Sequence, residues 1–264
     1  MSNVRVERDG SIGTVTLDRP EQRNAISIAM LEEITAAFAE LGADSSLRVV
    51  VLAGEGDHFC AGADFSDLTM MTPEGFDYGR SFEHAIDAMA ACPVPVVAKV
   101  QGAALGAGCQ IVGGSDLAIA AEDARFGIPA ARLGLVINFE NVQRLVLSVG
   151  VKRAGEILYT GRELSGLEAA DWGLVNEAVP ARALDARVRE LCETIAAGAP
   201  LTARAFKRGI GIVVRHASLE RERDGDADVI GEFDALASQA FASADLAEGV
   251  RAFRERRPPR FEGR

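Results

Sequence analysis

The chain has 264 residues, of which 48% are hydrophobic and 25% charged, the usual balance of a globular protein with a sizeable core. Its net charge of −11 argues against general nucleic-acid binding, because neutralising phosphates requires clustered cations. The longest apolar stretch, residues 88–98, is interrupted by Pro93 and Pro95 and cannot span a bilayer, so no membrane association is expected.

The cysteines and the N-terminus indicate a reducing compartment. The four cysteines lie far apart without CxxC spacing, and a strand-like pattern starts directly after the first residues, with no secretory leader. We therefore expect a cytoplasmic protein with free thiols. The three histidines are scattered without a metal-ligand spacing, so no metal site is expected.

The first two thirds of the chain alternate between strand-like and helical patterns. Asp9-Gly10 predicts the turn of an opening hairpin, and Ser27 stands where a helix N-cap would lie. Strands alternating with helices predict right-handed βαβ units. The expected elements are the hairpin over 4–17, a helix over 28–41, a buried strand over 49–52, a helix over 73–91, a second buried strand over 94–100, a short helix, and a third strand over 117–120.

From about residue 181 the strand patterns stop. Helical patterns follow at 184–197, 201–214 and 233–253, with a polar stretch at 220–228, so an all-helical C-terminal part is predicted. Arginines gather at the end of the chain, as either a solvated tail or a contact with an anionic ligand or an acidic neighbouring subunit. They are Arg251, Arg254, Arg256, Arg257, Arg260 and Arg264.

Two loops rich in small residues each follow a buried strand. The first is residues 57–64, Asp-His-Phe-Cys-Ala-Gly-Ala-Asp, and the second is residues 102–110, Gly-Ala-Ala-Leu-Gly-Ala-Gly-Cys-Gln. Such loops let the backbone approach a ligand closely, and two converging N–H groups would stabilise a carbonyl oxygen that gains negative charge. The glycines can equally serve tight turns and close helix packing alone.

Other motifs are missing from the sequence. Position 111 is isoleucine where GxGxxG needs its third glycine, and the chain has no GxxxxGK[ST], HExxH or GxSxG. A dinucleotide site, a P-loop, a zinc protease and a serine hydrolase of the elbow type are therefore not supported.

Along nearly its whole length the chain resembles the crotonase, or enoyl-CoA hydratase/isomerase, superfamily. The order and spacing of several segments carry the resemblance, which is more specific than any single glycine motif. These segments are Arg19-Pro20-Glu21-Gln22-Arg23-Asn24-Ala25, Phe59-Cys60-Ala61-Gly62-Ala63-Asp64, Gly102 to Gln110, Ser115-Asp116-Leu117, Phe126-Gly127-Ile128-Pro129 and Gly173-Leu174-Val175-Asn176.

The resemblance implies an α/β fold, a spiral of ββα and βαβ units over residues 1–196, with a helical trimerisation region over 197–264. It implies a homotrimer or a hexamer built as a dimer of trimers. It also implies acyl-CoA thioesters as ligands, so coenzyme A would be part of the substrate and no separate cofactor would be bound.

By the same resemblance, the amides of Ala63 and Ala107 would form an oxyanion hole around the thioester oxygen. Ala107 stands where many members have glycine, which keeps the N–H and adds a methyl group. The residues implied in substrate binding are Arg23, Ala25, Ala61, Asp64 and Phe65, and Arg23 could meet a coenzyme phosphate or be an ordinary surface arginine.

The chain departs from the hydratases at the two positions where they have glutamates, which are here Gln110 and Ala130. Gln110 can orient water but cannot accept a proton, and Ala130 can do neither. Losing one general acid–base group typically costs about 10²–10⁴ in rate, so hydration and isomerisation should both be weakened.

Glu140 is the best candidate for a replacement acid or base, although it could instead be a carboxylate that stabilises a helix N-terminus. Asn138 stands near the catalytic aspartate of some members, and Asp67 and Glu74 are weaker candidates. We expect an enzyme that stabilises a CoA-thioester enolate, nominally an enoyl-CoA hydratase or isomerase. The alternatives are a non-catalytic acyl-CoA-binding protein or an enzyme with a different reaction on a CoA thioester.

Overall fold

The computed structural model describes residues 2–64, 76–219, 238 and 242–260 of the chain. A six-stranded sheet in the order β1-β2-β3-β4-β6-β9 lies at its centre, with a three-stranded sheet, β5-β7-β8, beside it. Both sheets are mixed, because β1 pairs antiparallel with β2 and β7 with β8, whereas the other pairs are parallel. The strands are β1 (Val4–Asp9), β2 (Ile12–Leu17), β3 (Val49–Gly54), β4 (Val96–Val100), β5 (Ala103–Leu105), β6 (Leu117–Ala121), β7 (Arg125–Gly127), β8 (Leu164–Ser165) and β9 (Glu177–Val179).

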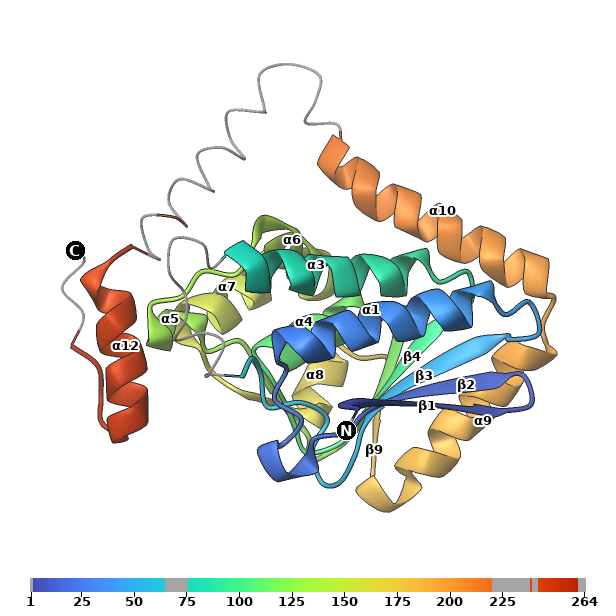
Figure 1. Cartoon of the computed structure of the whole chain (residues 1–264), viewed down its shortest axis with the longest axis horizontal. Coiled ribbons are helices and arrows are strands. Elements are labelled where there is room, and N and C mark those ends of the chain that lie inside the picture. The colour runs from blue at the N-terminus through green and yellow to red at the C-terminus, as the bar shows by residue number, and fades with distance from the viewer. Residues whose placement is uncertain (1, 65–75, 220–237, 239–241, 261–264) are drawn as a thin grey trace.

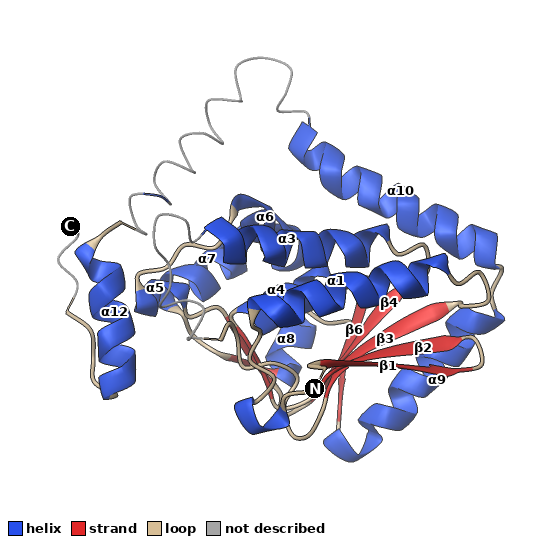
Figure 2. Ribbon diagram, in the orientation of Figure 1, coloured by secondary structure: helices blue, strands red, loops and turns tan. Residues whose placement is uncertain are grey.

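Helices cover both faces of the large sheet (Figures 1 and 2). α1 (Ile28–Ala43) and α3 (Phe76–Ala91) pack side by side on one face, and α9 (Leu184–Ala197) contacts β3, β4 and β6 from the other. The other helices of the body are the 3-10 helix η1 (Pro20–Gln22), α4 (Ala107–Gly114), α5 (Ala130–Leu133), α6 (Phe139–Val149), α7 (Val151–Thr160), α8 (Gly166–Trp172) and the 3-10 helix η2 (Ala181–Ala183).

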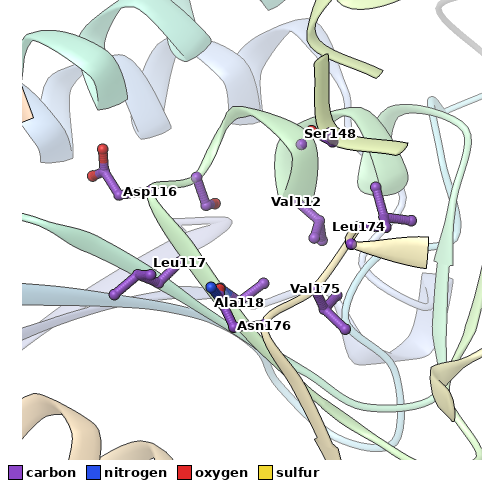
Figure 3. A pocket seen from close by; sticks show the side chains of 11 residues that line it. Val112, Asp116, Leu117, Ala118, Ser148, Leu174, Val175 and Asn176 are labelled. Atoms are coloured by element: carbon purple, nitrogen blue, oxygen red, sulfur yellow. The ribbon is translucent and has the colours of Figure 1, made fainter. Parts of the chain in front are cut away.

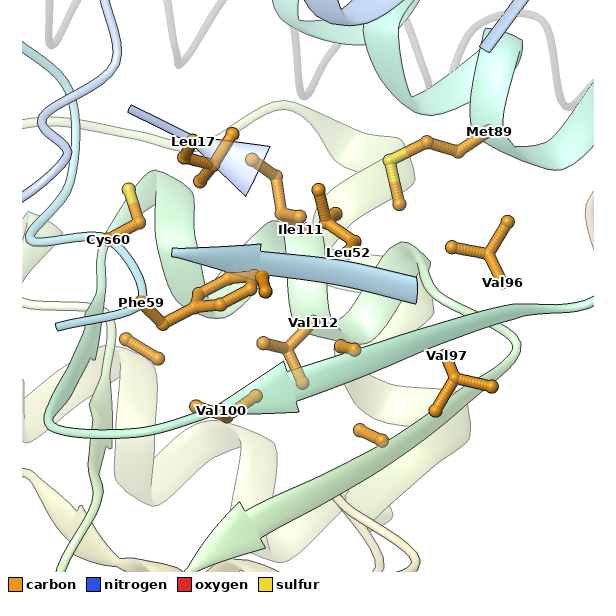
Figure 4. Packing of buried hydrophobic residues seen from close by; sticks show 14 of the residues in the cluster. Leu17, Leu52, Phe59, Cys60, Met89, Val96, Val97, Val100, Ile111 and Val112 are labelled. Carbon is orange, nitrogen blue, oxygen red and sulfur yellow. The ribbon is translucent and has the colours of Figure 1, made fainter. Parts of the chain in front are cut away.

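The core lies between the large sheet and the helices above it. Every residue of β3 is buried, as its continuous apolar run predicts for a strand covered on both faces. Leu52 of β3 and Val97 of β4 lie in one cluster with Met89 of α3 and Ile111 and Val112 of α4 (Figure 4). This packing sets α4, and with it the second small-residue loop, against the sheet.

The patterned elements of the first half are confirmed. Val4 pairs with Leu17 across the hairpin, and the Ser27 hydroxyl accepts a hydrogen bond from the Met30 amide to cap α1. The helix expected over 73–91 begins at Phe76, and residues 73–75 lie outside the described part. The pattern missed β5, β7, β8 and β9, because two or three residues are too few to show a period.

Beyond residue 181 the described chain is helical, as predicted. α9 is followed by α10 (Pro200–Leu219) and α12 (Ala244–Glu255), whereas the polar stretch at 220–228 lies outside the described residues. None of the helices within the described ranges combines the length and the apolar character that crossing a membrane requires.

A buried lysine anchors α10 to the body. Lys207 Nζ donates to the carbonyls of Met89 and Val94, both at 3.0 Å, and lies 2.7 Å from Asp116 Oδ2. The same carboxylate oxygen accepts the amide of Val96 at 2.7 Å. One cation therefore ties α10 to the end of α3, the start of β4 and the turn before β6.

α12 docks on α5 and holds two of the C-terminal arginines. Gly249 leaves no space for a side chain, because an added Cβ would lie 2.3 Å from the carbonyl oxygen of Leu133. Hydrogen bonds from Arg257 and Arg251, and from the Arg260 amide, hold the pKa of the Glu248 carboxyl well below its usual range. Arg251 and Arg257 thus have a partner within the chain itself.

We expect Lys207→Met to destabilise the protein, because it leaves the Asp116 carboxylate and two carbonyls without their cation. Breaking a buried ion pair typically costs about 3–5 kcal/mol, and the partial exposure of Asp116 places this loss near the lower end. Urea denaturation measures it. The matched control Arg208→Met changes the exposed neighbouring residue and should shift stability by less than about 0.5 kcal/mol. Equal midpoints for the two variants would contradict the anchoring role.

Candidate active site

A fully buried asparagine shapes the first part of the site. The Asn24 side chain accepts the Arg19 amide at 2.9 Å and donates to the carbonyls of Glu55 at 3.0 Å and His58 at 2.7 Å. Arg23 and Asn24 both have positive φ, 52° and 55°, which is unfavourable for residues with a side chain. The hydrogen bonds of Asn24 offset that cost and fix the turn beside the first small-residue loop.

The residues predicted to bind substrate lie together around this turn. The Ala61 amide donates to the Arg23 carbonyl at 2.9 Å. Arg19 donates to the Ala25 carbonyl at 2.8 Å and lies 3.0 Å from Asp64 Oδ2. Arg23, Ala25, Ala61 and Asp64 are thereby brought into one region, with the Arg23 side chain exposed. Phe65, like Asp67 and Glu74, lies outside the described residues.

The two small-residue loops are joined through their main chains. The Cys60 amide donates to the Ala103 carbonyl at 2.8 Å, and the Leu105 amide donates to the Cys60 carbonyl at 2.9 Å. An added Cβ at Gly108 would lie 2.5 Å from the Cys60 carbonyl oxygen, so this approach requires glycine. The sequence left open whether the glycines allow close packing or the approach of a ligand. The two roles are compatible, because close packing is what brings the two loops together.

The amides of Ala63 and Ala107 are placed as available donors. The amide of Ile26 donates to the Gly62 carbonyl and that of Asp64 to the Ile26 carbonyl, so the intervening Ala63 N–H points away from this pairing. Ala107 is the first residue of α4, where a helix has no internal acceptor for the N–H. Within the described part of the chain, neither amide has a hydrogen-bond acceptor.

Burial disfavours the thiolate form of the two cysteines beside these amides. Burial raises the pKa of the Cys60 and Cys109 thiols to about 12, because a thiolate would lose its hydration there. A protonated thiol is a poor nucleophile, so neither cysteine is a candidate catalytic group.

Gln110 and Ala130 lie on two different helices, α4 and α5. Gln110, half-buried on α4, lines a narrow cavity between α4, α6 and the end of β7. Ala130 is the first residue of α5 and packs against the edge of the core. The other residues that line the cavity are Cys109, Gly113, Ile128, Asn141, Arg144, Leu145 and Leu174.

A carboxylate that the sequence did not single out lies behind this cavity. Glu83 of α3 accepts hydrogen bonds at Oε1 from Asn138 Nδ2 at 2.5 Å and from Asn141 Nδ2 at 2.9 Å, and Arg144 Nη1 lies 3.2 Å from its Oε2. A usable signal was the position of Asn141, which continues the buried stripe of Leu145 and Val149 along α6. A polar residue in an apolar stripe calls for a partner.

Glu140, the predicted acid or base, is exposed in the first turn of α6. Asn138 caps that helix by accepting the Asn141 amide. Arg132 of α5 donates from Nε to the Thr160 carbonyl at 3.3 Å. The carboxylate that the described structure holds nearest the cavity's polar residues is thus Glu83 rather than Glu140.

A larger cavity, of about 130 Å³, lies elsewhere, between the end of α4, the start of β6 and the segment before β9 (Figure 3). Its polar groups serve the fold, since Asp116 binds Lys207 and the Asn176 side chain accepts the Ala118 amide. It lies at the amino end of β6, whereas both small-residue loops follow the carboxyl ends of parallel strands, where ligands of open α/β sheets bind. The fused loops with Ala63, Ala107 and Gln110 are therefore the candidate site, and this cavity is not.

Comparison with known proteins agrees with this fold. The family model for enoyl-CoA hydratase/isomerase matches residues 7–264. A probable enoyl-CoA hydratase of Mycobacterium bovis is 33% identical over 266 residues, covering 99% of this chain and 98% of that protein. The crystal structure of an enoyl-CoA hydratase/carnithine racemase from Magnetospirillum magneticum is 32% identical with a TM-score of 0.78, and covers 100% of this chain and 97% of that one.

An enoyl-CoA hydratase from Mycobacterium avium subsp. paratuberculosis is 27% identical with a TM-score of 0.82, covering 98% of each chain. These matches extend over both the α/β body and the C-terminal helices, and they agree with the two mixed sheets described above. The chain therefore has the crotonase fold and belongs to the enoyl-CoA hydratase/isomerase family.

Proposed function

We propose that this protein binds acyl-CoA thioesters and stabilises their enolate between the amides of Ala63 and Ala107. The observation that carries the proposal is the fusion of the two small-residue loops, which leaves these two N–H groups without acceptors in the described chain. Fixed donors aimed at a developing oxyanion are among the strongest catalytic effects, because they need no reorganisation during the reaction. Arg23, Ala25, Ala61, Asp64 and Phe65 hold the coenzyme portion.

The proposed enzyme lacks the usual glutamate pair, with Gln110 and Ala130 in its place. Glu140 is the candidate acid or base, and it would have to act from an exposed position at the start of α6. A non-catalytic acyl-CoA-binding protein is the second candidate. It is favoured by the hydrogen bonds that occupy Glu83, because an acceptor bound to two amides and a guanidinium is poorly placed to take a proton.

The helical region from residue 197 onward is proposed to form trimer contacts, in a trimer or a dimer of trimers. Phe206, Ile210 and Val213 lie at helical spacing on α10 and are 68%, 64% and 69% exposed in the single chain. An exposed apolar stripe on an anchored helix is typical of an interface.

Ala107→Pro should lower acyl-CoA turnover by about 10²–10³-fold, the usual cost of removing one oxyanion donor. Proline is tolerated at the first position of a helix, so α4 should persist. The matched control is Ala107→Gly, which keeps the N–H and should retain activity. Calorimetry with a nonreactive acyl-CoA tests the binding role in parallel. Unchanged affinity and unchanged turnover in a folded Ala107→Pro protein would contradict this placement.

Hydration of crotonyl-CoA by the unmodified protein should be weak or absent, and Gln110→Glu with Ala130→Glu should raise it by at least about 100-fold. Two neighbouring carboxylates would push one pKa upward, which suits an acid–base pair. Hydration is followed by the loss of enoyl absorbance. Ala131→Glu, on the exposed side of α5, is the charge-matched control and should give no gain.

Rapid hydration of crotonyl-CoA by the unmodified protein would contradict the hypothesis that it lacks a working acid–base group. The turnover of Glu140→Gln would then be the deciding measurement. A large fall in turnover with acyl-CoA affinity preserved would assign the role to Glu140. Turnover that survives the change would exclude it.

Phe206→Glu with Ile210→Glu should convert the trimer to monomers, because charges would be buried in an apolar interface. Light scattering measures the mass. Arg208→Glu, at an exposed α10 position off the apolar stripe, is the control and should leave the assembly intact. A double variant that remains trimeric would exclude this face from the interface.

A further inference from the structure

A short ladder of main-chain hydrogen bonds joins the two segments that carry the proposed oxyanion donors. Its centre is the parallel bridge between Cys60 and Ala104. Ala63 follows Cys60 by three residues, and Ala107 follows Ala104 by three residues. Both amides therefore lie a short and equal length of chain beyond the bridge, so a shift of one segment against the other changes their separation.

The ladder departs from regular parallel pairing at its first bond. The Cys60 amide donates to the Ala103 carbonyl at 2.8 Å, and the Leu105 amide donates to the Cys60 carbonyl at 2.9 Å. If this regular pattern continued toward the start of both segments, the Ala103 amide would donate to the His58 carbonyl. That carbonyl instead accepts the Asn24 side chain at 2.7 Å.

The imidazole of His58 takes the place of this main-chain acceptor. Its Nδ1 accepts the Ala103 amide at 3.2 Å. Gly102 leaves room for the ring, because an added Cβ would lie 2.4 Å from Nδ1 and 2.1 Å from the Asp57 carbonyl oxygen. A nitrogen that accepts a hydrogen bond carries no proton, so the neutral ring is protonated at Nε2.

His58 thus links the two small-residue loops through both its main chain and its side chain. The fully buried Asn24 holds its carbonyl in the first loop, and its ring holds the Ala103 amide at the start of β5. The other edge of β5 is paired with β7. The ring therefore completes the clamp on β5, the strand that leads directly into Ala107.

The position of β5 matters to the proposed chemistry because an oxyanion donor acts only at the right place. Without an acceptor, the Ala103 amide is left unsatisfied, which is costly for a partly buried group, so the start of β5 would move to find a new partner. A donor displaced with it stabilises the developing charge less well.

We propose that His58 is a positioning residue for the oxyanion hole. Through Nδ1 it fixes the start of β5 against the first loop and thereby sets the separation of the Ala63 and Ala107 amides. The ring itself neither contacts the substrate nor transfers a proton. The inference rests on the proposed function, because it concerns the same two donors.

The probe is acetoacetyl-CoA, whose enolate has its own ultraviolet absorption band and reports the oxyanion directly. The unmodified full-length protein should bind it more tightly than coenzyme A and increase the enolate band, because two fixed donors favour the charged form. If it binds acetoacetyl-CoA no better than coenzyme A and gives no band, the proposed function itself fails, whatever the variants show.

His58→Leu and His58→Asn have nearly the same shape, but only asparagine keeps an acceptor near the position of Nδ1. His58→Leu should weaken enolate binding about tenfold, less than the roughly 10²–10³-fold cost of losing a donor outright. Its affinity for coenzyme A should change by less than about twofold, because that ligand has no oxyanion. His58→Asn should restore enolate binding to within about threefold of the unmodified protein. His84→Leu, at an exposed position of α3, is the matched control.

Equal enolate affinities for the leucine and asparagine variants would overturn the inference. Hydrogen exchange over residues 101–107 tests its premise, since the Ala103 amide should exchange faster in His58→Leu and not in His58→Asn. Unchanged exchange in the leucine variant would also overturn it. If His58→Leu does not fold, His58→Gln replaces it, because the longer side chain carries its acceptor past the position of Nδ1. A glutamine variant that binds the enolate as well as the asparagine variant would then refute the role.

Discussion

The main-chain pairing of Cys60 with the segment from Ala103 to Leu105 is the contact on which the site depends. It fuses two loops that follow separate strands of the large sheet, and it is possible only because Gly108 lets α4 approach the Cys60 backbone. Asn24 supports the other side of the first loop from a fully buried position. Two backbone N–H groups are thereby fixed without a mobile side chain, which is the preorganisation that electrostatic catalysis requires.

Beyond the two loops, amides and an ion pair join α3 to the start of α6. Where a hydratase would exchange protons through two carboxylates, this chain has Gln110 and Ala130, and its nearest partly buried carboxylate, Glu83, is occupied by three donors. In the proposed function the protein keeps the two amides that stabilise charge, whereas Glu83 is engaged in holding α3 against α6.

Ion pairs and hydrogen bonds to charged groups hold the C-terminal helices, whereas apolar packing holds the α/β body. Lys207 reaches into the body from α10, and Glu248 gathers arginines at α12. The anchored α10 presents Phe206 and Ile210 outward, and their apolar surface gains free energy only when it is covered. A second copy of the chain is the cover that we propose, so assembly and the folding of this region should be coupled.

The sequence by itself determined the α/β body, the helical C-terminal part, the first-strand hairpin and the two small-residue loops. These features rest on hydrophobic period, on Ser27 as a cap and on runs of small residues, all of which are local. Only the tertiary structure decided that the loops pair through Cys60, and that Glu83 on α3 meets Asn138, Asn141 and Arg144 on α6. More than fifty residues separate Glu83 from these partners, and a charge in a helical pattern looks the same whether it faces water or a buried amide. The fold alone brings such side chains within hydrogen-bond distance.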